Sequence, residues 1–113
     1  MTVPSEHQEQ KVLVSWFRIQ YPNYLIFSVP NGGTRNKIEA KKLKDEGALA
    51  GIPDIVICTP GKTIFVEMKK RKGGTVSKAQ KEIHSLLEDM GYDVIIGYGF
   101  SDAMEKIQCT LKQ

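Results

Sequence analysis

The stretch that decides the fold runs from Gly51 to Lys70 and reads GIPDIVICTPGKTIFVEMKK. It contains two short apolar runs, at 55–58 and 63–66, which are rich in branched and aromatic residues. The residues between them, TPGK at 59–62, are typical of a turn because proline fixes φ and glycine tolerates a positive φ. The pattern therefore predicts a β-hairpin.

Three charged residues lie at the open end of this predicted hairpin. Asp54 precedes the first strand, Glu67 and Lys69 end the second, and residues two apart on a strand project to the same face. Pairing about the midpoint of the turn makes Asp54 and Glu67 cross-strand neighbours. Two such carboxylates repel unless a cation lies between them, which suggests a Mg²⁺ site. The alternative is a surface hairpin with incidental charges, disfavoured because unpaired charge beside a buried strand is costly.

The pattern PD at 53–54 followed by ExK at 67–69 resembles the PD-(D/E)xK nuclease signature. With GIPD at 51–54, NGG at 31–33 and EHxxQ at 6–10, the sequence resembles the stand-alone viral replication-repair nuclease (VRR-NUC) family over nearly its whole length. The resemblance implies a restriction-endonuclease-like core and metal-dependent hydrolysis of DNA phosphodiester bonds. An ordered set of four motifs is far more specific than the PD-(D/E)xK pattern alone.

The resemblance also implies a set of metal ligands. Asp54 and Glu67 would bind Mg²⁺ or Mn²⁺, and the backbone carbonyl of Met68 would add a further oxygen. Glu6 would supply a third carboxylate from the first helix. From spacing alone, Glu6 is better explained as an acidic residue at the positive end of a helix dipole, an order that the resemblance reverses, and Glu9 is a competing carboxylate.

Three further residues are candidates for roles beside the metal. Lys69 would hold the attacking water or neutralise the charge of the transition state. Gln80 occupies a place where many PD-(D/E)xK relatives have a glutamine, and it would orient water or phosphate. His84 is a candidate general base, although a lone histidine on a helix more often lies at the surface or in packing.

Basic and glycine-rich segments flank the predicted hairpin on both sides. Lysines and arginine next to glycine loops suit contacts to the DNA backbone, which depend on salt rather than on base sequence. The alternatives are ordinary turns and solvated helix faces. The residues predicted to contact DNA are Asn31, Gly32, Gly33, Arg35, Lys37, Lys41, Lys70, Arg71 and Lys72.

Length and composition set the class of protein. A chain of 113 residues with 41% hydrophobic and 26% charged residues predicts one globular domain over 1–113. A net charge of +3 permits a nucleic-acid partner without requiring one. The two cysteines have no metal-type neighbours, and no signal-peptide core or membrane-spanning run is present. We expect a soluble cytoplasmic protein, in a bacterial host cell if it is encoded by a phage or prophage.

Periodicity predicts helices at 5–20, 34–46, 77–90 and from 101 onward, with strands at 24–29 and 92–98 beside the hairpin. This order, α-β-α-β-β-α-β-α, predicts an α/β fold with a mixed sheet of about four strands and helices on both faces. The crossover from 63–66 to 92–98 should be parallel and right-handed. The predicted buried stripes are Val12, Leu13, Trp16, Phe17 and Ile19 on the first helix, and Ile83, Leu86, Leu87 and Met90 on the third.

The expected substrate is DNA of a particular structure. So short a chain has little surface for reading bases, and the family resemblance implies activity like that of a Holliday-junction resolvase. Cutting two strands symmetrically would require a homodimer. The alternatives are a non-catalytic DNA-binding module with the same fold, and a nuclease that acts on flaps or RNA.

Overall fold

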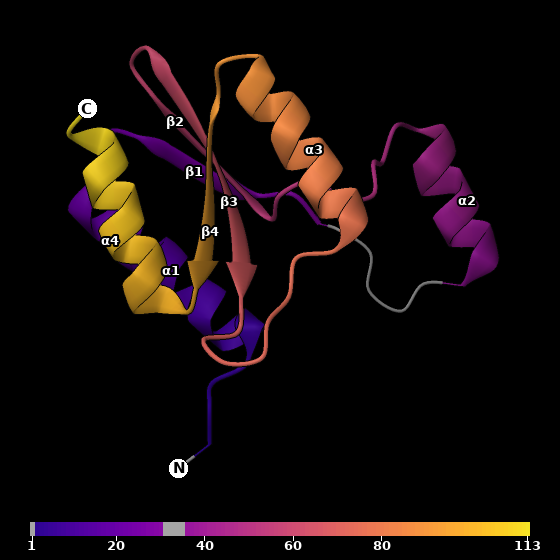
Figure 1. The fold of residues 1–113 in the computed structure, drawn as a ribbon, viewed down its shortest axis with the longest axis horizontal. Coiled ribbons are helices and arrows are strands. Elements are labelled where there is room, and N and C mark those ends of the chain that lie inside the picture. The colour runs from indigo at the N-terminus through magenta and orange to yellow at the C-terminus, as the bar shows by residue number, and fades with distance from the viewer. Residues whose placement is uncertain (1, 31–35) are drawn as a thin grey trace.

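A computed structural model describes residues 2–30 and 36–113 of the chain. It contains, in chain order, α1 (Glu6–Gln20), β1 (Leu25–Ser28), α2 (Lys37–Asp45), β2 (Ile55–Thr59), β3 (Lys62–Lys69), α3 (Lys78–Asp89), β4 (Asp93–Tyr98) and α4 (Phe100–Leu111) (Figure 1). The element order predicted from the sequence is confirmed.

The four strands form one mixed sheet in the order β1-β2-β3-β4. β2 and β3 pair antiparallel from Ile55 opposite Val66 to Thr59 opposite Lys62, which confirms the predicted hairpin and its register. β1 joins β2 antiparallel, and β4 joins β3 parallel, as predicted for the strand–helix–strand crossover. The hairpin therefore occupies the centre of the sheet.

Because side chains alternate along the end of β3, the apolar residues there face the core of the protein and the charged residues face the other side of the sheet. Val66 and Met68 are fully buried in a cluster that includes residues of α1 and α4. Glu67 and Lys69 alternate with them and so project from the opposite face, where α3 lies. α4 approaches the sheet closely, since a Cβ added at Gly97 would lie 2.5 Å from the Cβ of Ala103.

The buried stripe of α1 is narrower than predicted. Leu13 and Phe17 are fully buried, whereas Val12 and Ile19 are exposed, Ile19 by 82%. α1 packs beside α4 against one face of the sheet and buries one i, i+4 row, so apolar residues beside that row stay in solvent. The same buried row includes Glu9, four residues before Leu13, which the apolar pattern did not select.

The buried stripe of α3 also differs from the prediction. Leu87 is buried as expected, but Leu86 and Met90 are 56% and 66% exposed. The position that faces the sheet beside Leu87 is His84, three residues earlier, which is buried. The α3 residues that contact the sheet are therefore not the full set of apolar residues on the helix, and they include a polar side chain, that of His84.

α2 stands apart from the rest of the protein. Figure 1 shows it beyond α3, away from the sheet, and none of its residues is buried. Asn36 caps its N-terminus by accepting a hydrogen bond from the Glu39 N–H at 2.8 Å. None of the described helices is both long and apolar enough to cross a membrane.

Candidate active site

A pocket of about 400 Å³ opens where four segments meet. These segments are the start of α1, the loop before β2, the end of β3 and the first turn of α3. The residues that line it are Glu6, Ala50, Gly51, Asp54, Glu67, Lys69 and Gln80. It thus brings together five of the residues that the sequence selected for catalysis or metal binding.

The Asp54 carboxylate is fixed across the hairpin. Its Oδ2 accepts a hydrogen bond of 2.8 Å from the Met68 N–H, so the two strands hold it beside Glu67. The loop that delivers Asp54 packs tightly on α3. Gly51 has φ +92°, and a Cβ added there would lie 2.5 Å from the Ala79 carbonyl oxygen, which only glycine avoids.

Glu67 is a buried carboxyl group, with 2% of the residue exposed. Burial first, then a hydrogen bond and charge repulsion from Asp54, raise its pKa to about 9. The ammonium of Lys69 opposes this shift, and the charge of Glu6 adds to it. Ionising Glu67 in this pocket is therefore costly unless a cation is bound beside it.

This donor set fits a hard divalent cation. Glu67 Oε1 is buried and has no hydrogen-bond partner, and Asp54 adds a second carboxylate beside it. Within residues 2–30 and 36–113, no three His, Cys, Asp or Glu side chains lie close enough to hold a metal by themselves. The fit thus rests on the Asp54 and Glu67 pair, with Glu6 at the pocket wall.

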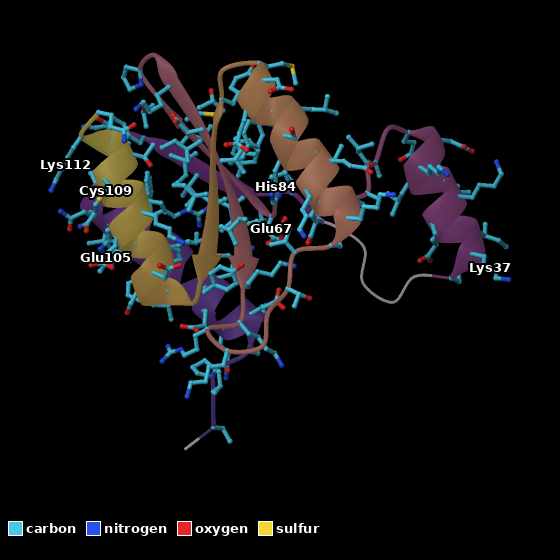
Figure 2. The ribbon with its side chains drawn as sticks, viewed as in Figure 1. Lys37, Glu67, His84, Glu105, Cys109 and Lys112 are labelled. Carbon is cyan, nitrogen blue, oxygen red and sulfur yellow. The ribbon has the colours of Figure 1, made fainter. Side chains whose placement is uncertain are left out.

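His84 approaches the site from α3. Its Nε2 lies 3.4 Å from Glu67 Oε1, and both side chains are buried (Figure 2). This distance permits a charge contact, but neither atom has a hydrogen-bond partner of acceptable geometry. Burial lowers the pKa of the imidazole, with the charge of Glu88 opposing and that of Lys69 adding to the shift. His84 is not among the residues that line the pocket.

Glu9, the alternative to Glu6 as helix ligand, is already engaged. Its carboxylate accepts two hydrogen bonds from Arg71, at 2.9 and 2.8 Å, and one from the Phe100 N–H at 3.1 Å. The Arg71 guanidinium lowers the pKa of Glu9. Glu6 lines the pocket and Glu9 does not, so the structure favours Glu6 at this position.

Gln80 combines a pocket position with a structural role. Its side-chain oxygen accepts from the Ser77 N–H at 2.9 Å, and its own N–H donates to Ser77 Oγ at 3.2 Å. This capping box begins α3 and holds the side chain at the pocket wall. Its role in orienting water or phosphate stays a prediction.

The residues predicted to contact DNA lie in three places. Lys37 and Lys41 are exposed on α2, and Lys70 and Lys72 are exposed in the loop after β3. Arg71 belongs to the same loop, but its guanidinium is held by Glu9. Asn31, Gly32, Gly33 and Arg35 lie outside the described residues. The described candidates therefore lie on α2 and in the β3–α3 loop, which begins directly after the pocket residue Lys69, and their contact with DNA stays a prediction.

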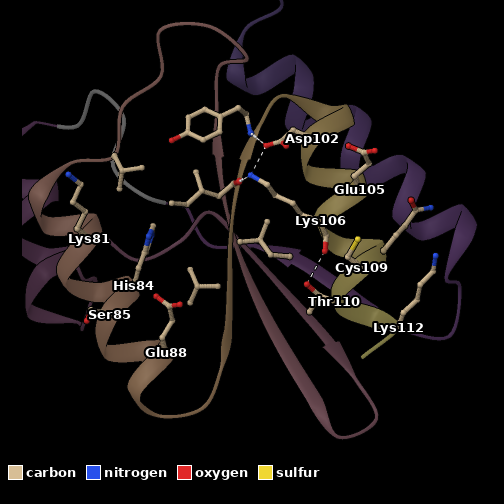
Figure 3. A pocket seen from close by; sticks show the side chains of 16 residues that line it. Lys81, His84, Ser85, Glu88, Asp102, Glu105, Lys106, Cys109, Thr110 and Lys112 are labelled. Carbon is tan, nitrogen blue, oxygen red and sulfur yellow. Dashed lines mark hydrogen bonds and ion pairs between the residues drawn. The ribbon is translucent and has the colours of Figure 1, made fainter.

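A larger hollow, of about 1190 Å³, lies between α3, β4 and α4 (Figure 3). Two side chains of α4 cover the open edge of β4 there. Asp102 Oδ2 accepts from the Tyr98 N–H at 2.9 Å, and Lys106 Nζ donates to the Ile96 carbonyl at 2.8 Å. These contacts protect an edge strand. Asp54, Glu67 and Lys69 do not line this hollow, so its size does not make it the reaction site.

Comparison with known proteins is consistent with this geometry. The VRR-NUC domain family matches residues 4–100. A solved structure described as a VRR_NUC domain protein is 25% identical, with a TM-score of 0.81, over 99% of this chain and 92% of that chain. Another, described as a VRR_NUC domain, is 20% identical, with a TM-score of 0.68, over 93% and 97%, and supports the fold alone. No curated protein matches the chain.

Proposed function

The chain belongs to the VRR-NUC domain family, and from this premise we propose that it is a metal-dependent DNA endonuclease that hydrolyses phosphodiester bonds. Family membership brings with it a nuclease-type fold. The observation that carries the proposal is the meeting of Asp54, Glu67 and Lys69 in one pocket, where the buried Glu67 carboxyl lies beside that of Asp54 and its Oε1 has no hydrogen-bond partner.

Asp54 and Glu67 would hold Mg²⁺ or Mn²⁺, with Glu6 and the Met68 carbonyl as further ligands. When bound, such a cation lowers the pKa of water and stabilises the charge that develops on the phosphate. The Met68 N–H keeps Asp54 oriented toward the pocket. Met68 itself is anchored in the core, so this orientation is fixed before any substrate arrives.

Lys69 carries the positive charge of the site. It is 9% exposed, and charge interactions are stronger in such a position than in water. Its ammonium would hold the attacking water or neutralise the transition-state phosphate. Gln80, which also lines the pocket and is held by its capping box, would orient the water or a phosphate oxygen.

The proposed substrate is branched DNA, cut in the manner of a Holliday-junction resolvase during replication, recombination or repair. A chain of this size presents little surface for base readout, which favours recognition of DNA shape. Symmetric cutting of two strands requires two sites, so we propose a homodimer. A phage or prophage origin accords with the family resemblance. The second candidates are a nuclease acting on flaps or RNA, and a non-catalytic DNA-binding module.

The Asp54→Asn variant tests the metal site. Asparagine keeps one oxygen near the Met68 N–H, so the fold should persist, but the charge that attracts the cation is lost. We expect Mg²⁺-dependent cleavage to disappear while DNA binding in EDTA or Ca²⁺ remains. The matched control is Glu105→Gln, on the exposed side of α4 (Figure 2). Cleavage that survives Asp54→Asn would contradict the site.

A substrate panel tests the reaction. Junction, flap, duplex and single-stranded DNA, with RNA counterparts, are offered with Mg²⁺ and with Mn²⁺. Preferential cutting of junctions supports the proposal, and preference for flaps or RNA supports the second candidate. Binding without cutting of any substrate would identify a non-catalytic module. Sedimentation in the same buffers measures whether the active species is a dimer.

A further inference from the structure

Two buried side-chain atoms in the described part of the chain lack a hydrogen-bond partner, and they face each other. They are Glu67 Oε1 and His84 Nε2, 3.4 Å apart, on side chains that are 3% and 7% exposed. Leaving one such buried atom unsatisfied is unfavourable. The two atoms are already within hydrogen-bonding range but are not aligned for a bond, so a small rotation of the imidazole ring would complete it. Each is therefore the natural partner of the other.

We propose that His84 is a positioning residue that donates its Nε2–H to Glu67 Oε1 and so fixes how the Glu67 carboxylate is presented to the pocket. The proposal rests on the function proposed above, because the orientation matters only if Glu67 binds a cation. Carboxylates that bind metals are commonly held by hydrogen bonds from the surrounding shell. The backbone of Met68 already gives Asp54 such a partner, and His84 would give one to Glu67.

The position of His84 argues against a general base. Its Nε2 lies 3.4 Å from Glu67 Oε1, and the residue lines the larger hollow beside α4 and not the pocket. A general base must reach the proton that it removes. An imidazole that donates from Nε2 provides the contact without removing any proton from the water.

The tautomer of His84 gives a direct test. Nitrogen–proton correlation NMR on the protein with saturating Mg²⁺, where Glu67 is a carboxylate and not the protonated acid that its raised pKa implies for the metal-free protein, reports which ring nitrogen carries the proton. We expect the Nε2–H form. The Nδ1–H form would overturn the proposal, because Nε2 would then be an acceptor unable to bind a carboxylate oxygen. This measurement requires no substitution and no activity.

Two substitutions test the consequence for the metal. His84→Gln keeps an N–H donor on a side chain of similar reach, whereas His84→Leu fills the space without a donor. Calorimetry with Mn²⁺ should show affinity about 10- to 100-fold weaker for His84→Leu, with most of it restored in His84→Gln. Ser85→Ala, one residue along α3 on its exposed side, should match the unsubstituted protein.

Cleavage kinetics distinguish a positioning role of His84 from a role in stability alone. In His84→Leu we expect the Mn²⁺ concentration needed for half-maximal cleavage to rise, while KM for DNA stays unchanged. A lower melting temperature with unaltered Mn²⁺ affinity would show a structural role only and overturn the proposal. If His84→Leu fails to fold, the proposal is tested by the Mn²⁺ affinity of His84→Gln and by the His84 tautomer that NMR reports. A protein that binds Mn²⁺ in a His84-dependent way yet cuts nothing would reject the proposed nuclease function alone.

Discussion

Arg71 and Glu9 form a bidentate ion pair, with Nε and Nη2 2.9 and 2.8 Å from the two carboxylate oxygens. The residues are 62 positions apart, and Glu9 also accepts from the Phe100 N–H. One buried carboxylate therefore joins α1, the loop after β3 and the start of α4. Since that loop begins directly after Lys69, the pair also fixes the exit of the chain from the candidate site.

Replacing Glu9 should destabilise the fold without touching the pocket. In Glu9→Gln the Phe100 N–H keeps an acceptor but Arg71 loses its charge partner, and we expect a loss of about 1–3 kcal/mol. The measurement is urea unfolding. The control is Glu105→Gln, on the exposed side of α4, which should leave the unfolding free energy unchanged. Equal stabilities for the two variants would contradict the role of Glu9.

The ion pair between Arg71 and Glu9 also predicts that folding stability decreases at acidic pH. Arg71 lowers the pKa of Glu9 below its ordinary value of 4.5, so the folded protein releases that proton more readily than the unfolded chain. The stabilisation is present above about pH 4.5 and is lost as the pH falls through the lowered pKa. Arg71→Ala should flatten this part of the curve, measured by unfolding midpoints. An unchanged acid slope would show that other groups cause it.

Glu67 should change the pH dependence of folding stability in the opposite direction to Glu9. Its pKa is raised to about 9 in the folded protein, so the fold binds a proton that the unfolded chain releases above its ordinary value of 4.5. Stability of the chelator-treated protein should therefore fall as the pH rises from about 4.5 toward 9. Glu67→Gln should abolish cleavage yet raise the neutral-pH melting temperature of this protein. A destabilised Glu67→Gln would contradict the raised pKa.

Gly51→Ala should disturb the site through packing. An added Cβ meets the Ala79 carbonyl oxygen at 2.5 Å, and the residue has φ +92°, so we expect a loss of about 2–4 kcal/mol with reduced cleavage. Gly47→Ala is the matched control. Gly47 has φ +108° but nothing within 4 Å of an added Cβ, so it carries the backbone strain alone. Similar losses for both would show that contact with α3 is unimportant.

The exposed lysines of α2 should contribute to DNA affinity through charge. For each lysine that contacts a phosphate, replacement by alanine should lower the slope of log affinity against log salt by about 0.9. We expect this for Lys37→Ala and Lys41→Ala, measured by fluorescence anisotropy in Ca²⁺. Lys112→Ala, at the end of α4 away from α2, is the control (Figure 2). An equal effect of all three would indicate only net charge.

The sequence by itself determined the local elements and the central hairpin. The turn at 59–62 set the register of β2 and β3, and that register placed Asp54 next to Glu67. Ser5 and Ser77 began α1 and α3 as their capping chemistry predicts. These features follow from the sequence because each depends on dihedral preferences and hydrogen bonds between residues close together in the chain.

Only the tertiary structure decided which side chains of each helix meet the sheet. Glu9 is buried because Arg71 and Phe100, both distant in sequence, arrive to satisfy it. His84 is buried because α3 turns that position toward Glu67, leaving Leu86 and Met90 in solvent. Burying a polar group is favourable only when a partner from elsewhere is present, and a local pattern of apolar residues contains no information about that partner.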